Sequence, residues 1–279
     1  MNPVIITCAL VGGELSKSDT PYLPVTPDEI AQEALAAARE GASVVHLHAR
    51  DAQGVPRHDP NIFQEIVGKI KSLFNQEKCD LPIFQFSTGG SCGMNLSERI
   101  APLTLQPEMA SLTLGTVNFG KDVFLNDQAT IEGIATELKN RKIGVELEIF
   151  DAGMIDNLQP LLKKNLLQEP LHFNFVLGVP GALGGDVANL IFLKSRIESY
   201  LARGSTWSVA GIGRHQLPLG MIALAAGGHV RVGLEDNIFL NKGELSKGNA
   251  PLVARISRLA AESGRPIATP EQARKILGL

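Results

Sequence analysis

The chain has 279 residues, of which 44% are hydrophobic and 20% charged, a composition ordinary for a soluble globular protein. The net charge of −3 does not indicate a nucleic-acid-binding surface. No run of about 18 apolar residues predicts a membrane span. The sequence begins without a signal peptide pattern, and its three cysteines form no metal-binding or disulfide pattern. We therefore expect a cytoplasmic enzyme.

Short apolar segments rich in Val, Ile and Phe alternate with helical segments along the chain. Because they are apolar almost throughout, they are typical of strands buried on both faces of a parallel sheet. We predict eight such strands, at 4–10, 43–48, 82–87, 109–114, 143–149, 171–177, 206–210 and 230–232.

The segments between these strands carry helix signals. Thr26 and Glu29 form a capping box with Pro27 at the first helical position, and Gly41 ends that helix. Asp59-Pro60 opens a second helix, whose apolar residues recur at helical spacing. Further helices are expected at 128–140, 151–164, 186–202, 216–226 and 251–263, with a short one from 269 onward.

Eight strand–helix repeats without a composition shift predict a (β/α)8 TIM barrel built as a single domain from residues 1–279. A doubly wound open sheet is the alternative. It is disfavoured because no GxGxxG motif follows the first strand. In a barrel, active-site residues come from the C-terminal ends of the strands and the loops after them.

A pair of histidines, His46 and His48, ends the second predicted strand. Residues two apart on a strand point to the same face, so both imidazoles can serve a metal such as zinc. A pair of structural histidines is the alternative, but the position at a strand end favours a metal site. A catalytic zinc needs a third protein ligand. Glu235 follows the last strand, which closes onto the first, and it can supply that ligand unless it simply faces water.

Other predicted strand ends are also polar or glycine-rich. Glu14 follows the first strand, Ser87 ends the third and Glu148 lies near the end of the fifth. A glycine-rich loop at 178–185 follows the sixth strand. It is either an anion-binding loop before a helix or a flexible connection with tight turns.

Five segments in this order resemble the β-keto acid cleavage enzymes, whose best-known members are the 3-keto-5-aminohexanoate cleavage enzymes of lysine fermentation. The resemblance covers essentially the whole chain. The segments are 6–14, ITCALVGGE; 46–51, HLHARD; 86–90, FSTGG; 108–112, EMASL; and 228–237, GHVRVGLEDN.

This resemblance implies a TIM barrel assembled as a homotetramer, with Zn²⁺ held by His46, His48 and Glu235. It implies a retro-Claisen exchange, in which a β-keto acid and acetyl-CoA give acetoacetate and a new acyl-CoA. It also implies catalytic roles for Arg231 and Asp236, which match family positions that handle deprotonation and charge near the zinc.

The resemblance further implies that Ser87 and Ser111 contact the substrate, that Glu14 recognises an amino group on it, and that Glu148 is an active-site carboxylate. Ser111 stands where other members often have threonine, which keeps the hydroxyl. We expect Asp236 to act as the general base, with Arg231 stabilising developing negative charge.

The glycine-rich loop is expected to lie along CoA through Gly181 and Gly184. The substrate side chain is left open by the sequence. Glu14 favours an amine. A quaternary ammonium group facing Trp207 is a second option, although a core or interface position is the commoner one for such a tryptophan, and a neutral side chain is a third.

Two other enzyme classes compete with this prediction. A zinc-dependent TIM-barrel hydrolase would use further histidines at the fifth and sixth strands, but the fifth ends near Glu148 and His172 comes too early in the sixth. His229 likewise begins its strand and is predicted to be structural. A metal-dependent aldolase would not use CoA. A non-enzymatic barrel is disfavoured because polar residues cluster at several strand ends.

Overall fold

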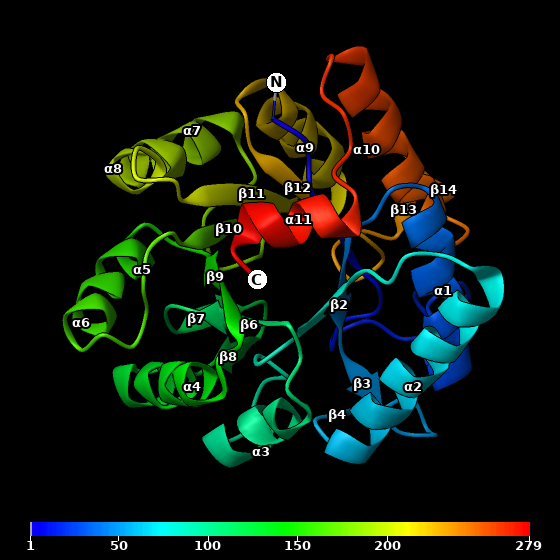
Figure 1. The fold of residues 1–279 in the computed structure, drawn as a ribbon, viewed down its shortest axis with the longest axis horizontal. Helices are drawn as coiled ribbons and strands as arrows, with labels where there is room; N and C mark the ends of the chain where they lie inside the picture. Colours follow the sequence, from blue (N-terminus) through cyan, green and yellow to red (C-terminus); the bar gives the residue numbers. More distant parts are fainter. Residues whose placement is uncertain (1) are drawn as a thin grey trace.

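The eight predicted strands close into one parallel barrel in the computed structural model, which describes residues 2–279 (Figure 1). The predicted (β/α)8 TIM-barrel class is therefore confirmed. The last strand pairs with the first, with Arg231 opposite Thr7, which completes the closure. In their order around the barrel the strands are β1 (Ile6–Ala9), β2 (Val44–Leu47), β5 (Ile83–Phe86), β6 (Met109–Thr113), β9 (Gly144–Ile149), β10 (His172–Leu177), β11 (Thr206–Gly211) and β12 (His229–Val232).

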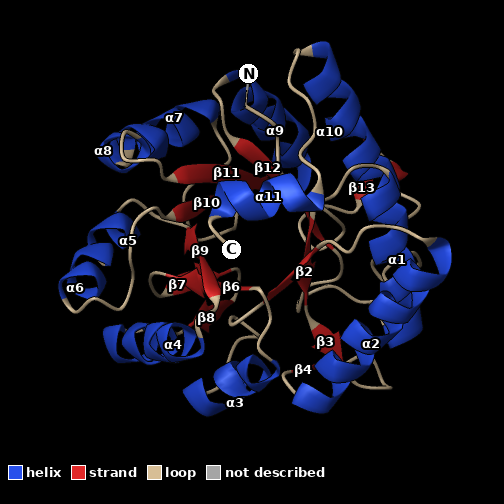
Figure 2. Ribbon diagram, in the orientation of Figure 1, coloured by secondary structure: helices blue, strands red, loops and turns tan. Residues whose placement is uncertain are grey.

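A ring of helices surrounds the strands (Figure 2). The capping box of the first helix forms as predicted, because Thr26 accepts the Glu29 amide while the Glu29 carboxylate accepts the Thr26 amide. The outer helices are α1 (Pro27–Arg39), α2 (Pro60–Glu77), α4 (Gln128–Arg141), α5 (Gly153–Asp156), α6 (Leu158–Lys163), α7 (Val187–Arg196), α8 (Glu198–Leu201), α9 (Gln216–Ala225) and α10 (Ala250–Glu262).

Two helices predicted to be continuous are each broken in two. The helix expected over 151–164 divides into α5 and α6 because Pro160 has no amide hydrogen to donate to the carbonyl of Asp156. The helix expected over 186–202 breaks between α7 and α8 at Ile197, whose backbone leaves helical geometry while its side chain is fully buried.

The structure adds short elements that the sequence did not predict. A helix α3 (Leu96–Ile100) runs into a 3-10 turn, η1 (Ala101–Leu105), after the third barrel strand. Three small hairpins follow barrel strands, and their strands of two or three residues are too short to show a period. They are β3–β4 (Ala49–Arg50 and Pro56–Arg57), β7–β8 (Val117–Phe119 and Asp122–Phe124) and β13–β14 (Phe239–Asn241 and Glu244–Leu245).

One end of the barrel is closed by the last helix, α11 (Pro270–Leu277), which lies across it in Figure 1. Its Ala273 packs in a small apolar cluster with residues that begin the strands, including Ile5, Val44 and Ile83. These residues mark the N-terminal end of the barrel, so the opening lies at the C-terminal end. Across residues 2–279, no helix is both long enough and apolar enough to cross a membrane.

Candidate active site

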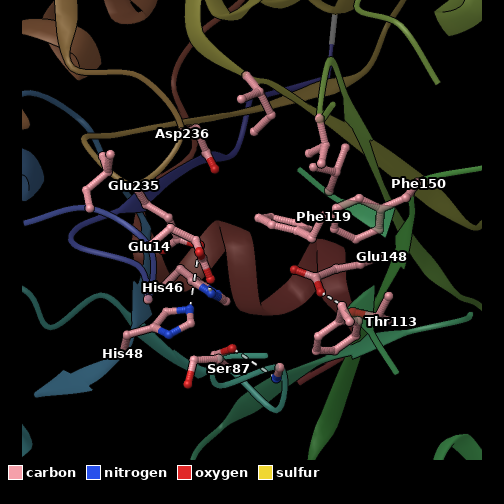
Figure 3. A pocket seen from close by; sticks show the side chains of 18 of the residues that line it. Glu14, His46, His48, Ser87, Thr113, Phe119, Glu148, Phe150, Glu235 and Asp236 are labelled. Atoms are coloured by element: carbon pink, nitrogen blue, oxygen red, sulfur yellow. Dashed lines mark hydrogen bonds and ion pairs between the residues drawn. The ribbon is translucent and has the colours of Figure 1, made fainter. Parts of the chain in front are cut away.

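A cavity of about 360 Å³ lies at the C-terminal ends of the strands (Figure 3). Its wall receives side chains from loops all round the barrel, which is the usual place for a TIM-barrel active site. Eight residues singled out in the sequence line this cavity: Glu14, His46, His48, Ser87, Glu148, Arg231, Glu235 and Asp236.

Two histidines and one carboxylate converge at one side of the cavity. The Nε2 atoms of His46 and His48 lie 3.7 Å and 3.5 Å from Oε1 of Glu235. One ligand atom from each of the three residues lies within 4.8 Å of the other two. In a tetrahedral zinc site, two ligand atoms are about 3.4 Å apart. The second carboxylate oxygen of Glu235 is buried without a hydrogen-bond partner, so this donor set fits a divalent metal ion.

Two glycines let the chain bring Glu235 to these histidines. Gly233 has φ +147°, and a Cβ there would lie 2.0 Å from the carbonyl oxygen of Ala9. Gly12 has φ +63°, and a Cβ there would lie 2.5 Å from Cγ of Glu235. The loops after β1 and β12 therefore approach closely only because both positions lack a side chain.

The protonation states of His46 and Glu235 suit metal binding. Burial lowers the pKa of His46 to about 4, so this imidazole is neutral at pH 7 and has a lone pair to share. Burial by itself would raise the pKa of Glu235, but the adjacent Arg231 guanidinium, together with the His48 and His46 imidazoles, outweighs that effect and holds this pKa well below its usual range.

Arg231 contacts three of the four carboxyl groups that line the cavity. Its Nε and Nη2 donate to the two oxygens of Asp236, each at 3.0 Å, in a bidentate pair. Nη2 also donates to Glu235 Oε1 at 2.6 Å, and Nη1 donates to Glu148 Oε1 at 3.4 Å. Arg231 and Asp236 are only 3% and 5% exposed, so their charges interact with little screening by water.

The other two carboxyl groups hold protons more tightly than usual. Burial raises the pKa of Asp236 above its ordinary value despite the bidentate contact with Arg231. Burial also raises the pKa of Glu148 to about 7, with Arg231 opposing this effect and Glu146 adding to it. One buried cluster thus contains an ionised carboxylate, Glu235, and a carboxyl group, Glu148, that changes its charge near neutral pH.

Thr113, which the sequence analysis did not single out, is the hydroxyl that reaches this cluster. Its Oγ1 donates to Glu148 Oε2 at 2.7 Å, and its side chain lines the cavity. Ser111 is fully buried and does not line the cavity; its Oγ accepts the amide of Thr88 at 3.4 Å. Residues two apart on a strand point to the same face, so the position of Ser111 in the sequence could have indicated Thr113 as a second candidate. In the barrel, Ser111 lies one layer deeper than Thr113.

The two glycines expected to contact CoA lie outside the cavity wall. A Cβ at Gly181 would meet the backbone of Asn118, and one at Gly184 would meet Asp186. The same loop contributes Val179 and Pro180 to the wall. Its contribution to the cavity itself is therefore apolar.

An aromatic wall faces the polar cluster and was also missed by the sequence analysis. Phe119 and Phe124 come from the hairpin β7–β8, and Phe150 follows β9. The rings of Phe119 and Phe150 lie 6.3 Å apart in an edge-to-face arrangement. The hairpin that presents two of these rings is too short to be detected from the sequence, so they gave no signal.

Three further residues lie away from the cavity wall. Trp207 is 3% exposed and packs against Phe175, which makes it a core residue and removes it as the partner of a quaternary ammonium substrate. His172 and His229 face each other at the other end of the barrel, with ring centroids 6.1 Å apart. His229 accepts the amide of Ile5, a structural contact that agrees with its prediction.

Comparison with known proteins gives the site a family context. The profile of the beta-keto acid cleavage enzymes matches residues 3–279. A 3-keto-5-aminohexanoate cleavage enzyme of Fusobacterium nucleatum is 45% identical over 100% of this chain and 99% of its own length. A 3-oxoadipate:acetyl-CoA acetyltransferase of Cupriavidus necator is 38% identical over 99% of this chain and 95% of its own. The solved structure of ObcA with a C4-CoA adduct and oxalate matches with a TM-score of 0.77 at 23% identity, over 93% of this chain and 68% of that one, and shows the fold.

Replacing Glu148 by Gln should stabilise the metal-free protein at high pH. A pKa raised from 4.5 to about 7 means that the folded state favours the neutral carboxyl group. The wild type is therefore fully stabilised below pH 4.5 and loses stability as pH rises through 7. Glutamine stays neutral, so Glu148→Gln should gain on the order of 3 kcal/mol over the wild type at pH 9 and little at pH 5.

Urea unfolding of both proteins at pH 5 and pH 9 measures this difference. Glu262→Gln, at an exposed position on α10, serves as the matched control and should behave as the wild type at both pH values. A difference between Glu148→Gln and the wild type that does not change with pH would contradict the assignment.

Proposed function

The chain belongs to the beta-keto acid cleavage enzyme family, and from this premise we propose that it exchanges acyl groups between a β-keto acid and acetyl-CoA. In the proposed reaction, the bond between the keto carbon and the CH₂COO⁻ group breaks. That group bonds to the acetyl carbon to give acetoacetate, and the CoA sulfur takes the released acyl group. The observation that carries this proposal is the convergence of His46, His48 and Glu235 beside the Arg231–Asp236 pair in one cavity. Residues 1–279 would act as one catalytic domain.

We propose that the metal is zinc and that His46, His48 and Glu235 hold it. Two imidazoles and one carboxylate are a donor set of catalytic zinc sites, which keep a fourth position for substrate or water. A bound zinc ion would supply a Lewis acid for the keto oxygen and orient the substrate carboxylate. The aromatic wall would exclude water from this side of the cavity.

Asp236 is the proposed general base. Hydrogens on C2 of a β-keto acid are acidified by the keto group, and C2 must lose a proton before it bonds to an acetyl carbon. Burial makes Asp236 a stronger base than an exposed aspartate, and its bidentate contact with Arg231 holds its orientation. Arg231 would also stabilise negative charge that develops on the substrate.

Glu148 is the proposed proton donor on the far side of the cavity. Figure 3 shows its carboxyl group across the cavity from the two histidines. A pKa of about 7 leaves much of this group protonated at neutral pH, which suits a general acid. Thr113 would hold one of its oxygens in place.

The proposed substrate carries a cationic amino group, with Glu14 as its counter-charge. Glu14 is exposed and lines the cavity. It can therefore bind an ammonium group without the energetic cost of a carboxylate that is buried unpaired in the free enzyme. The similarity to a 3-keto-5-aminohexanoate cleavage enzyme supports this substrate class. We propose that Ser87 also contacts the substrate and that Ser111, behind the cavity wall, holds the backbone amide of the adjacent Thr88 in place. Gly181 and Gly184 would let their loop approach CoA at the cavity entrance.

We further propose a homotetramer as the working assembly. The helix α7 exposes Val187, Ile191 and Phe192, each more than 40% accessible in a single chain. Apolar side chains clustered on one helix support burial against another subunit.

The reaction class is tested by measuring acetoacetate formation from a panel of β-keto acids. Turnover should require both acetyl-CoA and the metal, so that a chelator abolishes it and zinc restores it. His48→Gln should lose metal and turnover, whereas His172→Gln, a histidine at the closed end, should keep its metal. Metal-dependent turnover without acetyl-CoA would instead indicate a hydrolase or an aldolase.

Replacing Asp236 by Asn should lower kcat by roughly 10²- to 10⁴-fold, the usual contribution of a general base. The metal content, measured by mass spectrometry, should not change because Asp236 is not among the proposed ligands. Asp151→Asn, an exposed residue after β9, is the matched control and should keep wild-type turnover. Wild-type activity in Asp236→Asn would rule out the assigned base.

Replacing Glu14 by Gln should lower kcat/KM for an amino β-keto acid by about tenfold. This is the lower range for a charge-assisted contact, because Glu14 is exposed to solvent. Turnover of a neutral β-keto acid of the same length should change less than about threefold. An equal loss of kcat/KM for both substrates would show that Glu14 does not recognise the amino group.

A further inference from the structure

Gln85 is a buried amide directly beside one of the proposed metal ligands. It lies on β5 in register with His46 on β2, and it is 0% exposed. Its Oε1 lies 2.6 Å from Nδ1 of His46, a short hydrogen bond between two side chains inside the barrel. No role is assigned to Gln85 by the site described above.

The surroundings of Gln85 determine the direction of this hydrogen bond. Its Nε2 lies 3.6 Å from the sulfur of Met109, which offers a weak acceptor. The NH₂ group therefore points to the sulfur, and the carbonyl oxygen points to the imidazole. Because an amide oxygen only accepts, Nδ1 of His46 must carry the hydrogen.

A hydrogen on Nδ1 leaves Nε2 of the neutral ring with a free lone pair. Nε2 is the atom that faces Oε1 of Glu235, at 3.7 Å. The opposite tautomer would point an N–H bond at the place where a metal ion must find a lone pair. His46 is 1% exposed, so its ring has no room to turn over and present Nδ1 instead.

We propose that Gln85 is a positioning residue that selects the metal-binding tautomer of His46. This inference rests on the proposed metal site. It gives a functional role to a residue of β5, a strand that supplies none of the proposed metal ligands. Partners of this kind behind a ligating histidine typically change metal affinity by 10- to 100-fold.

The test uses two substitutions that differ in one property. Gln85→Met keeps the length of the side chain but removes the acceptor oxygen. Gln85→Glu keeps an acceptor at the same place. Asn174→Leu is the matched control, because Asn174 is also 0% exposed in the barrel interior but bonds to Glu146 and Ser208 instead of a ligand.

Zinc affinity is measured by competition with a chromophoric chelator. We expect Gln85→Met to bind zinc 10- to 100-fold more weakly than the wild type. Gln85→Glu should stay within about threefold of the wild type or bind more tightly, and Asn174→Leu should be unchanged. Equal affinities for Gln85→Met and the wild type would overturn the proposal. So would equal losses in Gln85→Met and Asn174→Leu, because these would reflect only a loosened core.

A second readout does not depend on zinc. Long-range ¹⁵N–¹H spectra of the metal-free protein report which ring nitrogen of His46 carries hydrogen, with the signal assigned by its loss in His46→Gln. The wild type and Gln85→Glu should show hydrogen on Nδ1, and Gln85→Met should lose this preference. An Nε2–H tautomer in the wild type would overturn the inference. Failure of the wild type to bind zinc would count against the proposed metal site, while these spectra would still decide the role of Gln85.

Discussion

The buried guanidinium of Arg231 is the group on which the charge distribution of the site depends. Asp236, Glu235 and Glu148 all contact it. Three carboxyl groups this close and this buried would otherwise hold their protons, because desolvation and mutual repulsion both oppose ionisation. Arg231 satisfies them unequally: two bonds go to Asp236, one short bond to Glu235 and one long bond to Glu148. The number of bonds alone does not set the protonation states, because the pKa of Asp236 stays raised while that of Glu235, which also faces His46 and His48, is lowered. Neighbouring carboxyl groups thus take different protonation states, as acid–base chemistry requires.

The barrel provides the geometry in which this single cation can work. Arg231 lies near the end of β12 and Glu148 near the end of β9, so both extend into the same mouth although 83 residues separate them. The other end is closed by α11 and its apolar contacts. Gly12 and Gly233 then allow the first and last loops to touch, which places Glu235 against the histidines of β2. The metal-binding side and the acid–base side are thus two halves of one cavity joined through Arg231.

The barrel strands and the hairpins after them divide the remaining tasks. The strands carry the groups whose positions must be held closely, such as His46 with Gln85 behind it. The hairpin β7–β8 and the loop after β10 carry apolar groups that shape the rest of the cavity, including Phe119 and Val179. Substrate choice would follow from these outer groups and from Glu14, because they can vary without disturbing the buried cluster.

The sequence by itself determined the barrel class, all eight barrel strands and the strand ends that line the cavity. It could do so because buried parallel strands are apolar throughout and their C-terminal ends meet at one rim. Only the tertiary structure decided which side chains meet there. Thr113 rather than Ser111 reaches the cavity because the two residues differ by one layer in depth. Phe119 lies in the cavity wall because it belongs to the hairpin β7–β8, whose strands are too short to show a periodic pattern in the sequence. The pairing of Gln85 with His46 depends on the register between β2 and β5. Protonation of Glu148 depends on burial among groups from other strands, and neither register nor burial can be read from one segment of sequence.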